Sequence, residues 1–212
     1  MVDNPLAPSW LAVPEDANAL PESVWSMHSA RNDDGELEIA GVPVSTLVGE
    51  FGTPVYVVDE ADVRARARRI REAFDRELAR VGSSGKVYYA GKAFLCTEVA
   101  RWVTAEGLGI DVASGGELAV ALAAGVDAGR LGLHGNNKSL AEIDRAVSVG
   151  VGAIILDSLI EIERVAEAAQ RHGRVQPVRL RINSGVHAST HEYLATARED
   201  QKFGIPLADA AA

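Results

Sequence analysis

The sequence predicts an α/β fold, an incomplete (β/α)8 barrel of the TIM type with about five of the eight βα units. Two observations predict it. Short apolar runs recur at intervals of 21 to 26 residues between residues 87 and 182. A Ser-x-x-Glu tetrapeptide, which marks the start of a helix, follows three of these runs. This alternation of strand and helix is typical of a parallel sheet.

Residues 1–38 are expected to form an irregular N-terminal arm. Prolines interrupt this segment, and an Asn-Asp-Asp-Gly sequence at 32–35 is a strong turn signal. A short edge strand is expected where Glu36–Ile39 leads into Val42–Pro43.

Residues 39–58 form the next predicted segment, with a strand at Val55–Val58. A long helix is expected to begin at Asp59 and to end near Val81, because acidic residues in its first turn interact favourably with the helix dipole. This helix opens the partial barrel, which is predicted to occupy residues 59–212.

Five strands and four intervening helices are predicted within the barrel. The strands are expected at Val87–Ala90, Gly109–Val112, Leu131–His134, Ala153–Leu156 and Val178–Ile182. The helices are expected at Thr97–Glu106, Gly116–Ala124, Leu140–Val149 and Leu159–His172. Capping boxes are predicted at 114–117, 139–142 and 158–161, and helix-ending glycines at 107, 125, 150 and 173.

An open doubly wound sheet is the alternative architecture for this pattern. No Gly-x-Gly-x-x-Gly sequence follows the first strand, and the even spacing of the strands favours the barrel. No closing element is expected in the segment from Ile205 to Ala212, so the barrel is expected to be cut off after its fifth unit.

Composition and charge exclude several function classes. The 212 residues carry a formal net charge of −9, and the one basic run, Arg64–Arg71, is interpreted as a solvated helix face. Nucleic-acid binding needs clustered basic residues and is not expected. One cysteine excludes an internal disulfide, and no apolar stretch is long enough to span a membrane, so a cytoplasmic setting is expected. Met1–Trp10 lacks a basic cluster and an apolar core, and is not expected to be a signal peptide.

Functional side chains of parallel βα folds lie at the carboxyl ends of the strands, where three residues are candidates. Lys92 follows the first strand. Desolvation there would disfavour its ammonium form, and the neutral amine could form a Schiff base with an aldehyde, unless the side chain simply extends into solvent. Asp111 is either a neighbour of the next helix dipole or a polar group at the mouth of a site. Arg181 either pairs with Asp157 or Glu192, or lies under a bound anionic or aromatic group.

Other polar residues are interpreted without a catalytic role. His134 is expected to be a hydrogen-bonding group at a strand end, and Cys96 an inert or mildly reactive thiol. His187 and His191 would share a face of a helix, but no carboxylate or cysteine completes a metal-ligand pattern around them. No metal site is predicted.

Five short motifs follow one another along the chain, with Gly185-Val-x-Ala-x-Thr-His-Glu192 before the last of them. They are Gly52-Thr-Pro-Val-Tyr-Val-Val-Asp59, Tyr89-Ala-Gly-Lys-Ala-Phe-Leu95, Asp111-Val-Ala-Ser-Gly-Gly-Glu-Leu118, His134-Gly-Asn-Asn-Lys138 and Lys202-Phe-Gly204. Together, over residues 38–207, they resemble the N-terminal half of the diaminopimelate decarboxylase family. That family belongs to the alanine-racemase-like, fold-type III pyridoxal-phosphate enzymes.

The resemblance implies pyridoxal 5'-phosphate as the cofactor and Lys92 as the catalytic residue that binds its aldehyde. It implies that Asp111 and Arg181 lie near the cofactor, and that the strand at Val55–Val58 belongs to a companion β domain. The implied activity is decarboxylation of meso-2,6-diaminopimelate to L-lysine and CO₂, the last step of lysine biosynthesis. A cytoplasmic homodimer that binds a small amino-acid substrate is implied, with no nucleic-acid or membrane partner.

Some features of the family are missing or different. Relatives often have a proline at Ser184 and a residue with a side chain at Gly91. The family's phosphate loop, ring-stacking histidine, ring-nitrogen acid and partner-subunit cysteine would lie beyond Ala212, so the chain alone is expected to show little or no decarboxylase activity. Two alternatives stay open. One is a single-barrel protein that binds pyridoxal phosphate without turnover, and the other is a sister decarboxylase of another basic amino acid or of carboxynorspermidine.

Overall fold

A computed structural model describes residues 8, 16–183 and 203–209 of the chain. The motif at 185–192, including His187, His191 and Glu192, lies outside the described residues, as do Ser184 and Lys202. The chain divides into two compact units, Met1–Asp62 and Val63–Ala212.

The first unit contains a small antiparallel sheet. Its strands β1 (Ser29–Arg31), β2 (Leu37–Ile39) and β3 (Val42–Pro43) lie in that order and are followed by helix α1 (Val44–Phe51). The turn between β1 and β2 is closed by the Gly35 amide, which donates to the Asn32 carbonyl at 2.9 Å. The expectation of an irregular arm is wrong at β1, because the turn signal joins two strands of a hairpin. The predicted strand at β2 and β3 is confirmed.

The predicted strand at Val55–Val58 is wrong. The segment has no strand assignment, and no strand among the described residues pairs with it. All four side chains are exposed, and Tyr56 is fully exposed. A single apolar run supplies β-propensity, but a strand also needs a neighbour for its backbone hydrogen bonds.

Helix α2 (Glu60–Arg80) begins one residue after the predicted start, because Asp59 is its cap. The Asp59 carboxylate accepts the Asp62 amide at 3.2 Å. The boundary between the two units falls inside this helix.

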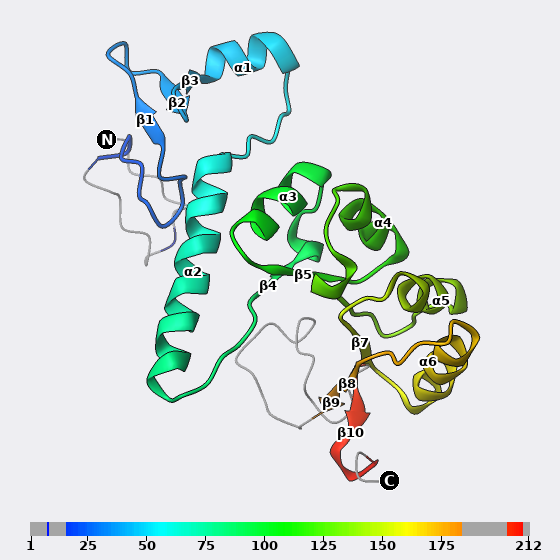
Figure 1. Cartoon of the computed structure of the whole chain (residues 1–212). Helices are drawn as coiled ribbons and strands as arrows, with labels where there is room; N and C mark the ends of the chain where they lie inside the picture. The colour runs from blue at the N-terminus through cyan, green and yellow to red at the C-terminus, as the bar shows by residue number, and fades with distance from the viewer. Residues whose placement is uncertain (1–7, 9–15, 184–202, 210–212) are drawn as a thin grey trace. The chain divides into compact units, whose positions relative to one another are not determined.

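The second unit is built on five parallel strands, and Figure 1 shows the helices that follow them along the outside of the sheet. The strands are β4 (Tyr88–Ala90), β5 (Gly109–Val112), β6 (Leu131–Leu133), β7 (Ala153–Leu156) and β8 (Val178–Leu180). The helices are α3 (Thr97–Ala105), α4 (Gly115–Ala123), α5 (Leu140–Val149) and α6 (Leu159–Arg171), with 3-10 turns at Gly91–Ala93, Ala128–Arg130 and Leu207–Asp209. Every predicted strand and helix of this region is therefore present.

The strand order decides between the two architectures. Each strand pairs with the next one along the chain, in the order β4-β5-β6-β7-β8. Right-handed crossovers that always advance in one direction place all their helices on the same face of the sheet. A doubly wound sheet has helices on both faces, so the order indicates a barrel wall.

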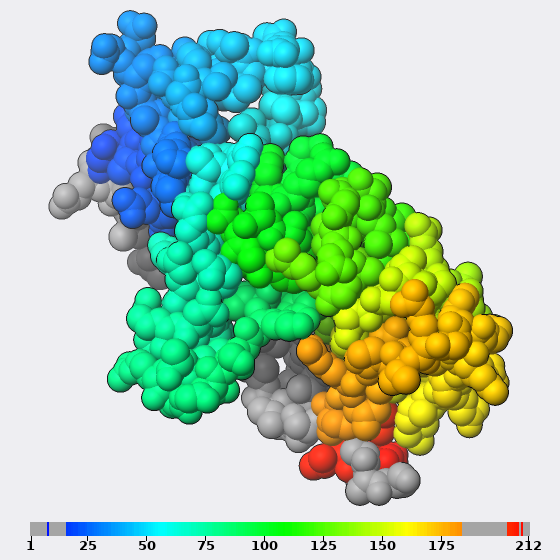
Figure 2. Space-filling model, viewed as in Figure 1, coloured from blue at the N-terminus to red at the C-terminus, as the bar shows by residue number. Residues whose placement is uncertain are grey.

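The core lies between the central strands and the helices. Its largest fully buried strand side chains are those of Ile110, Val112, Leu131, Leu133, Ile154 and Leu156. Leu118, Ile143 and Val147 pack on them from the helices. In Figure 2 the colour passes without a gap from green to yellow on the side of the second unit where Figure 1 places α3 to α6.

Only one of the three predicted capping boxes is complete. Ser139 and Glu142 exchange both hydrogen bonds at the start of α5. Ser114 accepts the Glu117 amide, but the Glu117 carboxylate accepts the Ala113 amide instead of the Ser114 amide. Ser158 makes no side-chain cap at the start of α6, where the Glu161 amide donates to the Ser158 carbonyl at 3.2 Å and the Glu161 carboxylate is engaged elsewhere.

Two short strands follow β8, of which the predicted strand Val178–Ile182 reaches only the first, and no element is predicted at the second. Strand β9 (Ile182–Asn183) extends the line of β8 after Arg181, and β10 (Ile205–Pro206) pairs with it in parallel. The Ile205 amide donates to the Arg181 carbonyl at 2.8 Å. Strands β9 and β10 therefore form a separate two-stranded parallel sheet next to the end of β8.

Candidate active site at the carboxyl ends of the strands

A cavity of about 470 Å³ lies where the strands of the second unit end. This volume is within the range of small-molecule sites. All three residues predicted from the sequence, Lys92, Asp111 and Arg181, line it. The other lining residues are Ala90, Val112, Ala113, His134, Gly135, Asn136 and Phe203. Parallel strands bring these distant segments together because their carboxyl ends meet at one rim.

Lys92 stands in the 3-10 turn directly after β4 and is exposed to solvent. The expectation of a desolvated amine is therefore wrong for this structure. Within the described part of the chain, Lys92 makes no hydrogen bond or ion pair, so its amine is accessible to a reactant.

The backbone around Lys92 is held on both sides. The Tyr89 hydroxyl donates to the Phe94 carbonyl at 2.7 Å and closes the turn, and burial raises the pKa of this hydroxyl. Gly91 is buried, and a Cβ atom there would lie 2.8 Å from the Asp111 carbonyl oxygen. The chain can therefore pass close to β5 only with a glycine at this position, which gives the departure from relatives at Gly91 a local packing reason.

Asp111 and His134 form a pair inside the cavity. Nε2 of His134 lies 3.2 Å from Oδ1 of Asp111, and each side chain is about one-third exposed. Gly132 is the register partner of Asp111 on β6, and a Cβ atom on Gly132 would lie 2.6 Å from the same Oδ1 atom. The glycine thus leaves the space that the carboxylate occupies. The interpretation of His134 as a hydrogen-bonding group at a strand end fits this contact.

Two side chains, Asp157 and Phe203, hold the guanidinium group of Arg181. Nη1 lies 3.5 Å from Oδ1 of buried Asp157, and the guanidinium carbon lies 4.5 Å from the centre of the Phe203 ring. The other carboxylate oxygen of Asp157 accepts the Gly204 amide at 3.0 Å. The scaffold pair with Asp157 is confirmed, while Glu192 lies outside the described residues.

A buried ion pair behind the cavity wall was not found from the sequence. Nζ of Lys138 lies 2.8 Å from Oε2 of Glu161, and each side chain is only 2% exposed. Lys138 belongs to one of the quoted motifs, but Glu161 has the sequence signature of a helix cap. No local signal distinguishes Glu161 from Glu142, which is a cap.

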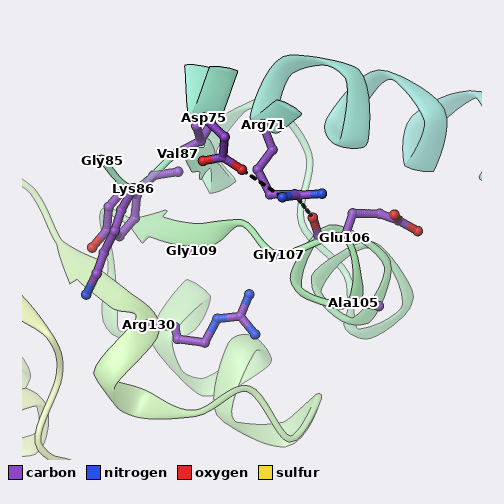
Figure 3. Close-up of a pocket in the computed structure, with 11 residues that line it drawn as sticks. Arg71, Asp75, Gly85, Lys86, Val87, Ala105, Glu106, Gly107, Gly109 and Arg130 are labelled. Atoms are coloured by element: carbon purple, nitrogen blue, oxygen red, sulfur yellow. Dashed lines mark hydrogen bonds and ion pairs between the residues drawn. The ribbon is translucent and has the colours of Figure 1, made fainter. Parts of the chain in front are cut away.

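A second cavity, also of about 470 Å³, lies at the amino ends of β4 and β5. Figure 3 shows Arg71, Asp75 and Glu106 around it, with Arg130 on the other side. Arg71 donates to the Glu106 carbonyl and to Asp75, each at 2.8 Å. Arg130 donates to the carbonyls of Thr104 and Leu108 at 2.9 and 2.6 Å. These cations serve the packing of the backbone, as is usual for this end of a barrel.

The residues of the carboxyl-end cavity suit part of an anionic aldehyde cofactor. Lys92 offers a primary amine to an aldehyde, and Arg181 offers a cation in reach of the same space. The Asp111–His134 pair offers a group that can take up or release a proton. In the described part of the chain, no cluster of three or more metal-ligating side chains is present, and no helix is long and apolar enough to cross a bilayer.

Comparisons with a family model and with curated proteins agree on one family. The model of the family described as "Pyridoxal-dependent decarboxylase, pyridoxal binding domain" matches residues 60–212. The diaminopimelate decarboxylase of Mycobacterium leprae is 51% identical over 198 residues, which make up 93% of this chain and 40% of the relative. The diaminopimelate decarboxylase of M. tuberculosis H37Rv is 50% identical over 193 residues, which make up 91% of this chain and 42% of the relative.

A solved structure supports the same fold. The diaminopimelate decarboxylase of M. jannaschii in complex with L-lysine matches with a TM-score of 0.77 and 31% identity, over 87% of this chain and 42% of that one. The predicted fold class is thereby confirmed. This chain spans about two-fifths of the length of the curated relatives, 40% for the M. leprae protein and 42% for the M. tuberculosis protein.

Proposed function

Because this chain belongs to the pyridoxal-dependent decarboxylases through their pyridoxal-binding domain, we propose that its Lys92 binds pyridoxal 5'-phosphate for the decarboxylation of meso-2,6-diaminopimelate to L-lysine. One observation carries the proposal. The amine of Lys92 lies exposed in a single cavity together with Asp111, His134 and Arg181, at the carboxyl ends of parallel strands.

The chemistry divides between the cofactor and the chain. When bound, the cofactor supplies the electron sink for the carbanion. In the reaction, the bond between the α-carbon and its carboxylate breaks, CO₂ leaves, and a proton takes its place on the α-carbon. Nζ of Lys92 would hold the cofactor by its aldehyde until the substrate amine takes its place, the Asp111–His134 pair could take up or release a proton in the same cavity, and the cation of Arg181 would orient an anionic or aromatic group there.

Activity is proposed for a longer assembly than this chain. The relatives extend over more than twice the matched length, and their names refer to the whole enzymes. We propose a cytoplasmic homodimer as the active form and little or no decarboxylase activity for the 212 residues alone. Residues 1–38 are proposed as an N-terminal arm, residues 39–58 as part of a companion β domain, and residues 59–212 as the pyridoxal-binding barrel segment.

The test is covalent trapping of the cofactor on the chain. The chain is mixed with pyridoxal phosphate, reduced with borohydride and digested, and the modified lysine is identified by peptide mass mapping. Label is expected on Lys92. The matched control is Lys86, an exposed lysine that lines the cavity at the other end of the sheet.

Two variants complete this test. Lys92→Ala should remove the label, while Lys86→Ala should leave it unchanged. Equal labelling of both lysines, or label on Lys86 alone, contradicts the proposal.

For the substrate, the complete enzyme is assayed for CO₂ release from meso-diaminopimelate, L-lysine and L-ornithine. Release from another amino acid at a higher kcat/KM contradicts the proposed substrate.

A further inference from the structure

The ion pair between Lys138 and Glu161 is buried on all sides behind the wall of the carboxyl-end cavity. Taking two charges out of water costs free energy, and a buried pair is often no more stable than apolar side chains of similar volume. Stability alone is therefore a poor reason for these two residues. The groups that they hold are a better guide to their role.

Lys138 holds the loop that follows β6. Its Nζ donates to the Gly135 carbonyl at 2.6 Å. Gly135 has a φ of 118°, a conformation that residues with a side chain rarely adopt, so the loop needs such support. Gly135 lies between His134 and Asn136, and all three line the cavity. The ammonium group of Lys138 thus fixes the backbone that carries His134.

Glu161 holds the segment that follows β7. Its Oε2 accepts the Asp157 amide at 2.8 Å, in addition to the Lys138 ammonium group. Asp157 in turn contacts Arg181 and the Gly204 amide. Glu161 is therefore two contacts away from a cation that lines the cavity.

This arrangement has a local cost at the start of α6. Glu142, in the same tetrapeptide position of the preceding unit, caps its own helix together with Ser139. The Glu161 carboxylate does not complete a capping box with Ser158, and its Oε1 is buried with no hydrogen-bond partner in the described part of the chain. A missing cap and an unpaired buried oxygen both cost stability. A role in holding the cavity wall accounts for both.

We propose that Lys138 and Glu161 are a pair of positioning residues. In this inference, which rests on the proposed function, Lys138 positions His134 for its contact with Asp111, and Glu161 positions Asp157 for its contact with Arg181. The pair thereby joins the loops after β6 and β7 into one rigid wall for the cofactor. Neither side chain is among the residues that line the cavity.

The test replaces both charges at once. In the double variant Lys138→Met with Glu161→Leu, apolar side chains fill the space. Urea unfolding should stay cooperative, with a loss of stability no larger than the two freed backbone groups, the Asp157 amide and the Gly135 carbonyl, account for. Borohydride labelling of Lys92, titrated with pyridoxal phosphate, should nevertheless need an about tenfold higher cofactor concentration, the size typical of losing outer-shell partners of a bound group. A purely structural pair would leave this concentration unchanged.

A matched control removes an exposed ion pair between helices α5 and α6, next to the buried pair in the chain. Arg171 of α6 and Asp144 of α5 form an exposed pair at 2.9 Å. The double variant Asp144→Leu with Arg171→Met should label Lys92 at the concentration of the unmodified chain. Equal weakening in both double variants contradicts the inference.

A readout without cofactor separates this inference from the proposed function. Hydrogen exchange of the Asp157 amide is measured by NMR, and the Lys138→Met, Glu161→Leu variant should exchange at least about tenfold faster there, while core amides stay protected. If the unmodified chain fails to label at Lys92, the proposed function is wrong, and the exchange rate still reports on the pair. Unchanged exchange at Asp157 in a folded double variant overturns the inference.

Discussion

The two ends of the parallel sheet carry cavities of the same size and use their charges differently. At the amino ends, Arg71 and Arg130 are bound to backbone carbonyls. At the carboxyl ends, Lys92 is unpaired within the described residues, and the Asp111–His134 pair is open to solvent. Each cavity has one exposed lysine, so exposure of an amine does not by itself mark a reactive site. What differs is the partner of the other charged groups, which is a backbone carbonyl for Arg71 and Arg130 and a histidine for Asp111.

The largest effect is expected from replacing Lys92, at the carboxyl ends of the strands. In the complete enzyme, Lys92→Ala should lower kcat by about 10⁴-fold or more, because the variant cannot form the proposed covalent link to the cofactor. Lys86→Ala should change kcat less than twofold. Steady-state assays of CO₂ release measure both. Near-normal turnover by the Lys92→Ala enzyme would exclude this lysine as the cofactor ligand.

The next effect comes from Gly132, which leaves room for the Asp111 carboxylate. In Gly132→Ala the new methyl group meets Oδ1 of Asp111, and overpacking of this kind costs about 1–3 kcal/mol. Lys92 labelling should weaken together with the free energy of unfolding. The control is Gly49→Ala, at an exposed glycine whose Cβ would meet no atom within 4 Å. The packing argument is contradicted if Gly132→Ala and the unmodified chain have the same unfolding midpoint and the same labelling titration.

A smaller effect is expected at the amino ends, and it should concern stability only. Arg130→Met removes the donor to two backbone carbonyls, which should lower the free energy of unfolding by about 1–2 kcal/mol. Cofactor labelling of Lys92 should remain at the level of the unmodified chain. Weaker labelling at equal stability would mean that the two cavities are coupled.

The smallest effect is expected in how the free energy of unfolding depends on pH. Hydrogen bonds from Arg68 and Arg64 lower the pKa of Glu106, next to the amino-end cavity, to about 2. A carboxylate with a lowered folded-state pKa contributes stability above its unfolded pKa and loses it as the pH falls toward the folded value. The free energy of unfolding should therefore fall between about pH 4.5 and pH 2, and less steeply in Glu106→Gln. Urea unfolding at a series of pH values measures the two slopes, and equal slopes would contradict the prediction.

The sequence predicts the barrel segment almost to the residue because its central strands are buried. The central strands β6 and β7 are apolar and buried along their whole length, so their runs stand out from the amphipathic helices. The same criterion fails at Val55–Val58, since pairing depends on a neighbour that the run itself does not specify. It also misses α1, which begins directly after β3 and has no side-chain cap.

The candidate site was partly predictable for a related reason. Strand ends locate Lys92, Asp111 and Arg181, because the topology gathers these positions at one rim. The Lys138–Glu161 pair was not predictable, since its two residues lie 23 positions apart and Glu161 has the pattern of a cap. Contacts between neighbouring loops depend on side-chain directions that a single sequence does not contain.

The strand order also determines which loops can contribute to a ligand-binding site. A doubly wound sheet binds its ligand in the crevice at its topological switch point, so that its geometry ties the ligand to two particular strands. The order from β4 to β8 never reverses, so the described strands have no such crevice. Every βα unit instead contributes one loop to a common rim. Substrate preference can therefore be altered one loop at a time, while the residues that hold the sheet together stay unchanged.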